Sequence, residues 1–444
     1  MKKKPSDRVT VVGGGLAGSE AAYQLAERGV FVDLYEMRPI TMTPAHHTGQ
    51  FAELVCSNSF GANEGVSPAA LLKEEMRLFG SLILKAGDQA RVDAGSALAV
   101  DREKFSAEVT RVIESHPRIA IHREVVERIP DGPTIIATGP LTHESLTADL
   151  IRQLGEDPLS FFDAAAPIVF GESIDMDYAF YGSREGGQDY INCPLTKEQY
   201  ERFYEALVTA EQHEKHDFED ASFFEGCLPI EELARRGFKT PLFGPMKPVG
   251  LSNPLEGGRR PYAVVQLRRD NAAGSLWSLV GFQTNLRWGE QKRVFQMIPA
   301  LHRAEFARYG VMHRNTYLKS PKILTAALNT RMRPDLWLAG QMIGVEGYME
   351  SAASGILAAL NAARYVEGED PLVLPRETMM GALFYYISHT DPASFQPMNA
   401  TFGLFDLPPE AQAIKDKRER RQWLKDRALR TLADFLDQRV SHYA

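Results

Sequence analysis

A glycine-rich turn near the start of the chain limits the possible folds more than any other feature. Val9–Val12 is a short apolar run of the kind that forms a buried parallel strand, and Gly-x-Gly-x-x-Gly spacing follows it. A helix over Ser19–Arg28 and a second strand ending at Glu36 complete the pattern. Glycines leave room for a pyrophosphate, the helix N-terminus supplies N–H groups, and the carboxylate can bind both ribose hydroxyls. The pattern predicts an adenine-dinucleotide site with these residues: Gly13, Gly14, Gly15, Leu16, Ala17, Gly18 and Glu36.

A second strand–turn–helix pattern occurs late in the chain, between Asp335 and Arg364. In addition, the strand Thr134–Gly139 ends in Ala-Thr-Gly, which commonly closes the first half of a flavoprotein's dinucleotide domain. One ligand held by both ends of a chain is the usual arrangement for FAD, and a separate NAD(P) fingerprint is missing. A turn that needs small residues only for packing is the alternative. The late cofactor-binding residues are predicted to be Gly340, Gln341, Gly344, Val345, Glu346 and Gly347.

The pattern of strand-forming, helix-forming and turn-forming residues changes along the chain. Residues 8 to 140 alternate strand-like and helical runs, whereas residues 195 to 325 are punctuated by proline and glycine. We therefore predict an α/β fold: a Rossmann-like FAD-binding domain of the glutathione-reductase type with an inserted α+β domain. The expected divisions are 1–195 for the first part of the FAD-binding domain, 196–325 for the insertion, and 326–444 for the return segment and C-terminal helices.

Charge is distributed unevenly. The net charge is −8, yet residues 226–333 hold 18 Lys or Arg against six Asp or Glu, a local balance of 18 − 6 = +12. The basic pairs in this segment, such as Arg268-Arg269 and Lys292-Arg293, suit contact with phosphates, although a solvated basic face is the simpler explanation. No apolar run reaches the roughly 20 residues of a membrane-spanning helix and no signal peptide begins the chain, so no membrane association and a cytoplasmic location are expected.

Five blocks can be recognised along the chain: Val12–Ala22, Glu53–Phe60, Cys227–Glu232, Met246–Leu251 and Leu338–Tyr348. Taken together, they resemble the folate- and FAD-dependent tRNA (uracil-5)-methyltransferase family, TrmFO. The resemblance covers nearly the whole chain. The glycine fingerprint is shared with a related family, the tRNA wobble-uridine modifying flavoproteins (MnmG), whose members are longer.

The resemblance implies transfer of a one-carbon unit from 5,10-methylenetetrahydrofolate to C5 of the T-loop uridine, position 54, of tRNA. FADH2 would supply the reducing equivalents and NAD(P)H would recharge the flavin. The expected partners are the T-arm of tRNA, folate and NAD(P)H; no protein partner is indicated. The basic insertion would then hold the RNA backbone.

Three cysteines occur, far apart and without a Cys-x-x-Cys pair, so neither a disulfide framework nor a metal site is expected. Uracil C5 becomes nucleophilic when a thiolate adds at C6. Cys227 precedes a predicted helix over Pro229–Arg236, whose positive end favours a thiolate, so we predict that Cys227 is this nucleophile. The resemblance implies that Cys56 is a second catalytic residue, as a base, a thiol partner or a shield for the flavin-bound carbon adduct, and Cys193 is predicted to be structural.

The sequence leaves other interpretations of the site and of the function open. His46, His47 and Tyr348 lie in segments that could stack on a pterin. The alternative enzymes are an MnmG-like wobble-uridine modifier and a small-molecule flavin oxidoreductase. A non-catalytic, FAD-stabilised RNA-binding protein is a further alternative, but it leaves the combination of thiol and flavin site unexplained.

Overall fold

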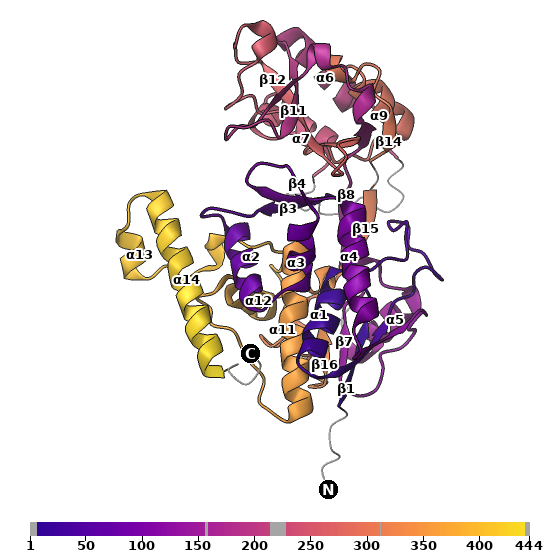
Figure 1. The fold of residues 1–444 in the computed structure, drawn as a ribbon, viewed down its shortest axis with the longest axis vertical. Coiled ribbons are helices and arrows are strands. Elements are labelled where there is room, and N and C mark those ends of the chain that lie inside the picture. Colours follow the sequence, from indigo (N-terminus) through magenta and orange to yellow (C-terminus); the bar gives the residue numbers. More distant parts are fainter. Residues whose placement is uncertain (1–6, 156–158, 214–227, 311, 440–444) are drawn as a thin grey trace.

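The larger lobe, which contains both ends of the chain (Figure 1), is built on a five-stranded parallel sheet with strand order β16-β7-β1-β2-β6. The computed structural model describes residues 7–155, 159–213, 228–310 and 312–439. Val12 pairs with both Tyr35 and Ile136, so the central strands end at one edge. In sheets of this kind ligands bind beyond the carboxyl ends of the strands. The strands are β1 (Arg8–Val12), β2 (Phe31–Tyr35), β6 (Ile119–His122), β7 (Thr134–Ile136) and β16 (Leu336–Leu338).

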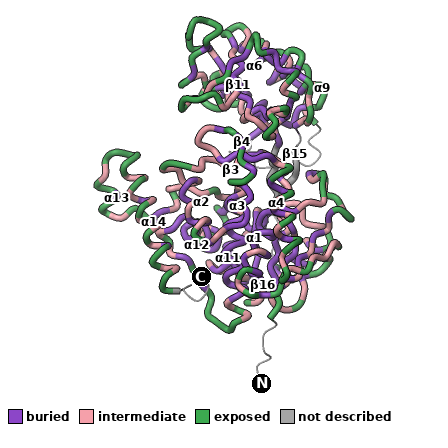
Figure 2. Tube along the Cα trace, viewed as in Figure 1, coloured by how far each residue is buried: buried purple, intermediate pink, exposed green. Residues whose placement is uncertain are grey.

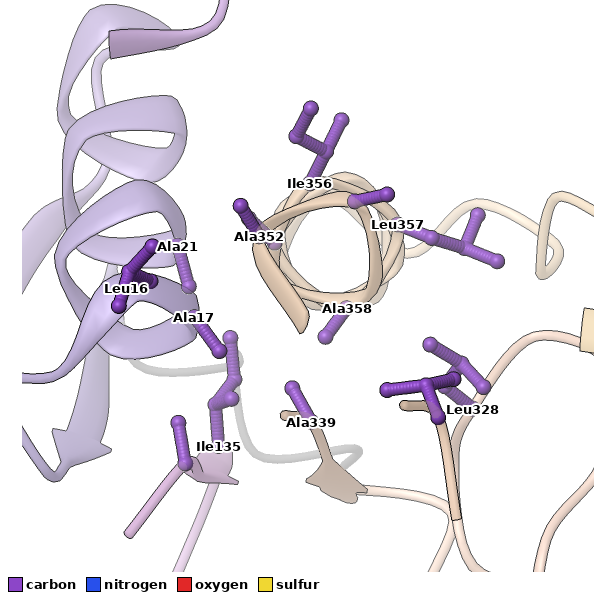
Figure 3. Packing of buried hydrophobic residues seen from close by; sticks show 14 of the residues in the cluster. Leu16, Ala17, Ala21, Ile135, Leu328, Ala339, Ala352, Ile356, Leu357 and Ala358 are labelled. Atoms are coloured by element: carbon purple, nitrogen blue, oxygen red, sulfur yellow. The ribbon is translucent and has the colours of Figure 1, made fainter. Parts of the chain in front are cut away.

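Two helices from opposite ends of the chain pack closely beside this sheet: α1 (Leu16–Glu27) and α11 (Tyr348–Glu367). Small residues make the approach possible, since a Cβ added to Gly355 would lie 2.2 Å from the Ala17 carbonyl oxygen. Ala17 and Ala21 lie on the side of α1 toward α11, and Ala352 projects from α11 toward α1 (Figure 3). The late strand–turn–helix pattern therefore joins the same sheet as the early one, as the sequence predicts.

Further helices complete the larger lobe, and α14 lies along its outer side (Figure 1). None of the helices within the described ranges is both long and apolar enough to cross a membrane. The further helices of the larger lobe are α2 (Pro68–Leu78), α3 (Leu82–Gln89), α4 (Arg102–Ser115), α5 (Glu144–Leu154), α10 (Ser320–Ile323), α12 (Met379–His389), α13 (Pro409–Ala413) and α14 (Lys417–Arg439).

The smaller lobe contains a six-stranded sheet with the order β10-β11-β12-β13-β9-β14. Its strands are β9 (Ile168–Phe170), β10 (Phe180–Gly182), β11 (Tyr190–Leu195), β12 (Ala263–Arg269), β13 (Leu276–Leu279) and β14 (Phe306–Arg308). Its helices are α6 (Lys197–Thr209), α7 (Ile230–Arg235), α8 (Thr240–Phe243) and α9 (Trp288–Phe295). The sheet takes in residues on both sides of the division expected at 195/196, because β9, β10 and β11 pair with later strands rather than with the parallel sheet.

Short pairings lie where the lobes meet (Figure 1). One is the antiparallel pair β8 (Leu159–Ala164) and β15 (Met312–Tyr317), and the other is the small sheet of β3 (Ser59–Ala62), β4 (Arg91–Val92) and β5 (Ala97–Val100). Each lobe has its own buried core (Figure 2). The molecule is thus an α/β domain with a separately packed insertion, the fold class that the sequence predicts.

Candidate active site at the carboxyl edge of the parallel sheet

A cleft with an empty volume of about 1270 Å³ opens at the carboxyl edge of the parallel sheet. The early glycine turn and the first residues of α1 line it, and so do Glu36, Cys56, Gly340 and Tyr348. These residues come from four separate parts of the sequence. The fold therefore brings the predicted dinucleotide turn, the late turn and one cysteine to a single cavity.

The glycines of the early turn have different roles. Gly13 has φ +102°, and a Cβ there would lie 2.5 Å from the Ala137 carbonyl oxygen. A Cβ on Gly18 would lie 1.8 Å from the Gly13 carbonyl oxygen, whereas one on Gly15 would meet nothing within 4 Å. Gly13 and Gly18 are thus required by the chain's own packing, and Gly15 leaves open space. That space lies at the N-terminus of α1, whose first turn carries no acidic residue and can accept an anion.

Glu36 lies at the end of β2, where the sequence predicts the ribose-binding carboxylate, but it already has protein partners. Its Oε2 accepts from Gly14 N–H at 2.8 Å and from Arg38 Nη2 at 3.2 Å. Its Oε1 accepts from Arg38 N and Nε, both at 3.0 Å. Burial by itself raises the Glu36 pKa, but the charge and hydrogen bonds of Arg38 outweigh it, so the pKa lies below its usual value. Each oxygen of the carboxylate thus accepts two hydrogen bonds from the protein.

The late turn contributes to the cleft through some of its residues. Gly340 and Gln341 line the cavity, whereas Gly344–Gly347 are not among the residues that line it. A Cβ on Gly344 would lie 2.5 Å from the Phe395 ring, so this glycine is needed for packing. Glu346 is buried and accepts a hydrogen bond from Gln341 Nε2 at 3.1 Å, which fixes the side chain that borders the cavity.

The Cys56 loop is held from both lobes. Cys56 N–H donates to Tyr348 Oη at 2.8 Å, and Arg102 Nη2 donates to the Cys56 carbonyl oxygen at 2.7 Å. Arg102 also donates to the Leu54 carbonyl oxygen at 2.8 Å and forms a 2.9 Å ion pair with Asp270 of the smaller lobe. The backbone around the thiol is therefore fixed on both sides.

The smaller lobe makes a second attachment to this loop. Arg268 donates to Asn58 Oδ1 at 3.0 Å and to Ser57 Oγ at 2.8 Å. Asn58 Nδ2 donates in turn to the carbonyl oxygens of Val100 and Arg269, each at 2.9 Å. The expectation that Arg268 belongs to an open basic face is wrong, because β12 directs it into the junction between the lobes.

The other two cysteines differ from Cys56 in what the structure describes of them. Cys227 lies outside the described residues, as does the segment before it, so no geometry bears on its predicted role. The helix expected over Pro229–Arg236 is present as α7, with Pro229 at its N-cap. Cys193 is fully buried in β11, and this burial raises the pKa of its thiol, which agrees with the structural role predicted for it.

The site contains one further residue that the sequence analysis considered and several that it missed. His46, considered for pterin stacking, does line the cavity; its pKa falls to about 4, first through burial and then through the Arg38 charge, so the ring is neutral near pH 7. Arg102 and Asp270 carry no spacing signal, because 168 positions separate them. Arg38, two residues after Glu36, could have been found as a cation beside a predicted buried acid.

These residues fit FAD. The cavity runs from a glycine turn at a helix N-terminus to Tyr348, and its lining includes a buried carboxylate at the end of the second strand. Gly15 provides space that a side chain would fill, and the α1 N–H groups provide donors for phosphate. Gly13, Gly14 and Glu36 would hold the adenosine and diphosphate half, and Gly340 and Tyr348 border the remaining volume.

Comparison with known proteins agrees with this site. The family model described as "GIDA: Glucose inhibited division protein A" matches residues 8–370. A protein of Lactiplantibacillus plantarum named "Methylenetetrahydrofolate--tRNA-(uracil-5-)-methyltransferase TrmFO" is 56% identical over 435 residues, covering 98% of each chain. A protein of the same name from Anoxybacillus flavithermus is 56% identical over 430 residues, covering 96% of this chain and 99% of its own.

Among solved structures, GidA of Aquifex aeolicus superimposes with a TM-score of 0.66 at 16% identity, covering 98% of this chain and 77% of that one. This likeness confirms the fold. The family model covers most of the chain and the relatives match it almost from end to end. The chain therefore belongs to the GIDA family and, within it, to the TrmFO family.

Proposed function

We propose that the protein methylates C5 of a tRNA uridine, position 54 of the T-loop, with 5,10-methylenetetrahydrofolate as carbon donor. The observation that carries the proposal is the position of Cys56, whose loop borders the same cavity as the dinucleotide turn and is tied to it through Tyr348. A thiol beside a flavin site suits a reaction that activates a pyrimidine and also needs a reductant. The names of the relatives support the same substrate and donor.

The residues have separate roles in this proposal. Bound FAD supplies the reducing equivalents that convert the transferred one-carbon unit into a methyl group. Gly13, Gly14 and Gly15, with Leu16, Ala17 and Glu36, line the cavity and hold its adenine-dinucleotide half, and Gly340 and Gln341 border the other half. Tyr348 fixes the Cys56 backbone beside the cavity.

The cysteines provide nucleophilic chemistry. We propose that the Cys227 thiolate adds to uracil C6, so that C5 gains enolate character, and that it leaves when the C5 proton has been removed. Cys56 faces the same cavity and acts beside it as a base or thiol partner. Arg102 and Arg268 both interact electrostatically with Cys56, an electropositive setting of the kind that reactive cysteines have.

The test is a methylation assay with purified protein, an unmodified tRNA transcript, NAD(P)H and methylenetetrahydrofolate labelled in its one-carbon unit. Label is expected in ribothymidine, and it should not appear when labelled S-adenosylmethionine replaces the folate. Cys227→Ala and Cys56→Ala should each abolish transfer while RNA binding survives. Cys193→Ala is the matched control, since that thiol is buried in the smaller lobe, and it should keep activity.

Absence of label from folate, with FAD still bound, would favour the alternative of a wobble-uridine modifier or a small-molecule oxidoreductase. The high identity to TrmFO relatives along the whole chain argues against both. We further propose NAD(P)H as the electron source and, because the substrate is tRNA, action in the cytoplasm.

The smaller lobe is proposed to carry most of the RNA contact. Arg259 and Arg260 are exposed there, whereas Arg287 and Arg293 are ion-paired with Glu211 and Glu290 at 3.1 and 2.6 Å. Exposed residues of this lobe, rather than the half-buried Arg268, are therefore the ones whose charge reversal should weaken RNA binding in a salt-dependent way.

A further inference from the structure

Three aromatic rings of the smaller lobe stack in series: Phe306 in β14, Tyr309 just after it, and Trp288 at the start of α9. The ring centroids of Phe306 and Tyr309 are 5.0 Å apart, and the two rings are inclined by 13°. Those of Tyr309 and Trp288 are 5.7 Å apart, with an inclination of 12°. The elements that carry the rings lie on one flank of the smaller lobe (Figure 1). We call these three residues the aromatic stack.

The aromatic stack runs from the core of the smaller lobe to its surface. Phe306 packs against the buried core, whereas Trp288 is 56% exposed. Tyr309 covers one face of the indole, so the exposed surface of Trp288 lies on its other face and its edges. An indole has a large apolar surface, and covering it with a flat ligand is favourable.

A buried glutamine holds the outer two rings in place. Gln291, in the first turn of α9 with Trp288, donates from Nε2 to the Gly310 carbonyl oxygen at 2.8 Å, and its Oε1 accepts from Gly310 N–H at 2.8 Å. Gly310 directly follows Tyr309, so these two bonds fix the segments that carry the two rings to each other. A ring that is already ordered loses little conformational entropy when a ligand stacks on it.

The aromatic stack lies next to a wall of the cavity. A Cβ added to Gly310, the residue after Tyr309, would lie 2.7 Å from the carbonyl oxygen of Ala165, which lines the cavity. The same oxygen accepts from Thr284 N–H at 3.4 Å, on the segment that leads to Trp288. Trp288 is not among the residues that line the cavity. A ligand that reaches both must therefore extend out of the cavity, as a polynucleotide does.

The charge beside Trp288 suits a polyanion. Lys292 is four residues later on α9, so its side chain and the indole lie on the same face of the helix. Lys292 is exposed, and no ion pair joins it to a carboxylate of the described residues. Glu290, the acid of this helix, is paired with Arg293 at 2.6 Å. An open aromatic face next to an uncommitted cation is the combination that binds a base and its phosphate.

We propose that Trp288 is a stacking platform for an unpaired base of the tRNA T-loop other than the target uridine, and that Lys292 contacts the phosphate of that nucleotide. This rests on the proposed function. The target base must leave its stack to enter the cavity, and the platform replaces the stacking that another base of the loop then loses. Stacking tolerates any base, so the platform positions the strand while the cavity selects the target.

The experiment is a thermodynamic cycle between protein and RNA that needs no turnover. The RNA is a T-arm stem-loop in which the unpaired bases other than the target are removed one at a time, as abasic nucleotides. Affinity is measured by fluorescence anisotropy for the FAD-bound chain, for Trp288→Ala and for Trp288→Phe. The matched control is Phe243→Ala, an aromatic residue of the same lobe that is 82% exposed.

With the complete RNA, Trp288→Ala is expected to weaken binding about tenfold, and Trp288→Phe less, because a phenyl ring still stacks. With one particular abasic RNA, Trp288→Ala should cost less than about twofold, because the contact is already lost. The Phe243→Ala control should cost the same on every RNA. The fluorescent base 2-aminopurine, placed at the coupled position, should be quenched on binding to the wild-type chain and not on binding to Trp288→Ala.

Equal losses on all the RNAs, or no loss at all, would overturn the platform. An unchanged RNA affinity combined with a raised KM for NAD(P)H would assign the ring to the adenine of that dinucleotide and overturn the RNA assignment. The methylation assay separates this from the proposed function, because wild-type chain that methylates while the cycle stays additive refutes only the platform. If the wild-type chain neither binds nor methylates RNA, both fall together.

Discussion

Replacing Asp270 with asparagine removes the only carboxylate paired with Arg102 in the described chain while keeping the size of the side chain. The side chains of Arg102 and Asp270 are 14% and 3% exposed, so the pair is buried between the lobes. Removing one partner of a buried pair typically costs about 3–5 kcal/mol. Arg102 keeps the carbonyl oxygens of Leu54 and Cys56 as acceptors, which places the expected cost at the lower end, about 3 kcal/mol.

That cost should appear as opening of the Cys56 loop. Because about 1.4 kcal/mol corresponds to a tenfold change in an equilibrium, a loss of about 3 kcal/mol raises the open population roughly a hundredfold. The assay is the rate of alkylation of each cysteine by iodoacetamide, followed by mass spectrometry of the peptides. Cys193 reports global unfolding in the same sample, because it is fully buried in the other core.

Asp93→Asn is the matched control. Asp93 pairs at 3.2 Å with Arg269, the residue before Asp270, but its side chain is 70% exposed, so its loss should change Cys56 alkylation by no more than a few fold. An unchanged Cys56 rate in Asp270→Asn would refute the argument that the smaller lobe holds the loop. Equal acceleration of Cys56 and Cys193 would refute it as well, since the effect would then be global.

Further expectations concern the cofactor site. Gly18→Ala places a Cβ 1.8 Å from a backbone oxygen, so it should lower the free energy of unfolding of the FAD-free chain in urea by about 1–3 kcal/mol. Gly15→Ala adds its Cβ to open space, so it should leave that free energy unchanged. It should still weaken FAD binding at least tenfold, as measured by flavin fluorescence. Glu36→Gln should weaken FAD binding about ten- to a hundredfold, since it removes a charged acceptor; retained affinity would exclude a ribose contact. The pKa of His46 is about 4 in the folded chain, against its ordinary value of 6.5 in the unfolded chain. The neutral ring therefore costs no stability above pH 6.5, and the folded chain loses stability as the pH falls from 6.5 toward 4. His46→Gln should therefore reduce the acid-side loss of stability of the FAD-free chain by up to about 3 kcal/mol, and identical pH profiles would contradict the shift.

Local patterns in the sequence predicted the elements that depend on neighbouring residues. The early strand, glycine turn and helix occur as expected, although α1 begins at Leu16 rather than Ser19. The late helix was expected over residues 351–364 and spans Tyr348–Glu367. These predictions succeed because the turn must meet requirements of its own backbone, such as the positive φ of Gly13.

Contacts between distant residues could not be predicted in the same way. Arg268 was expected on an open basic face, yet it bonds Ser57 and Asn58, because strand pairing in the smaller lobe decides which way its side chain points. The division expected at 195/196 likewise separated β11 from its partner β12, since a run of strand-forming residues does not reveal which sheet it joins.

The sequence by itself determined the fold class, the dinucleotide turn and the family, because these depend on short-range spacing and on blocks that can be recognised one at a time. Only the tertiary structure decided what surrounds Cys56. The partners of its loop come from α4, α11 and β12, and their positions follow from how two separately packed cores meet. Hydrogen bonds and ion pairs depend on distance in space, which the order of residues in the chain does not specify.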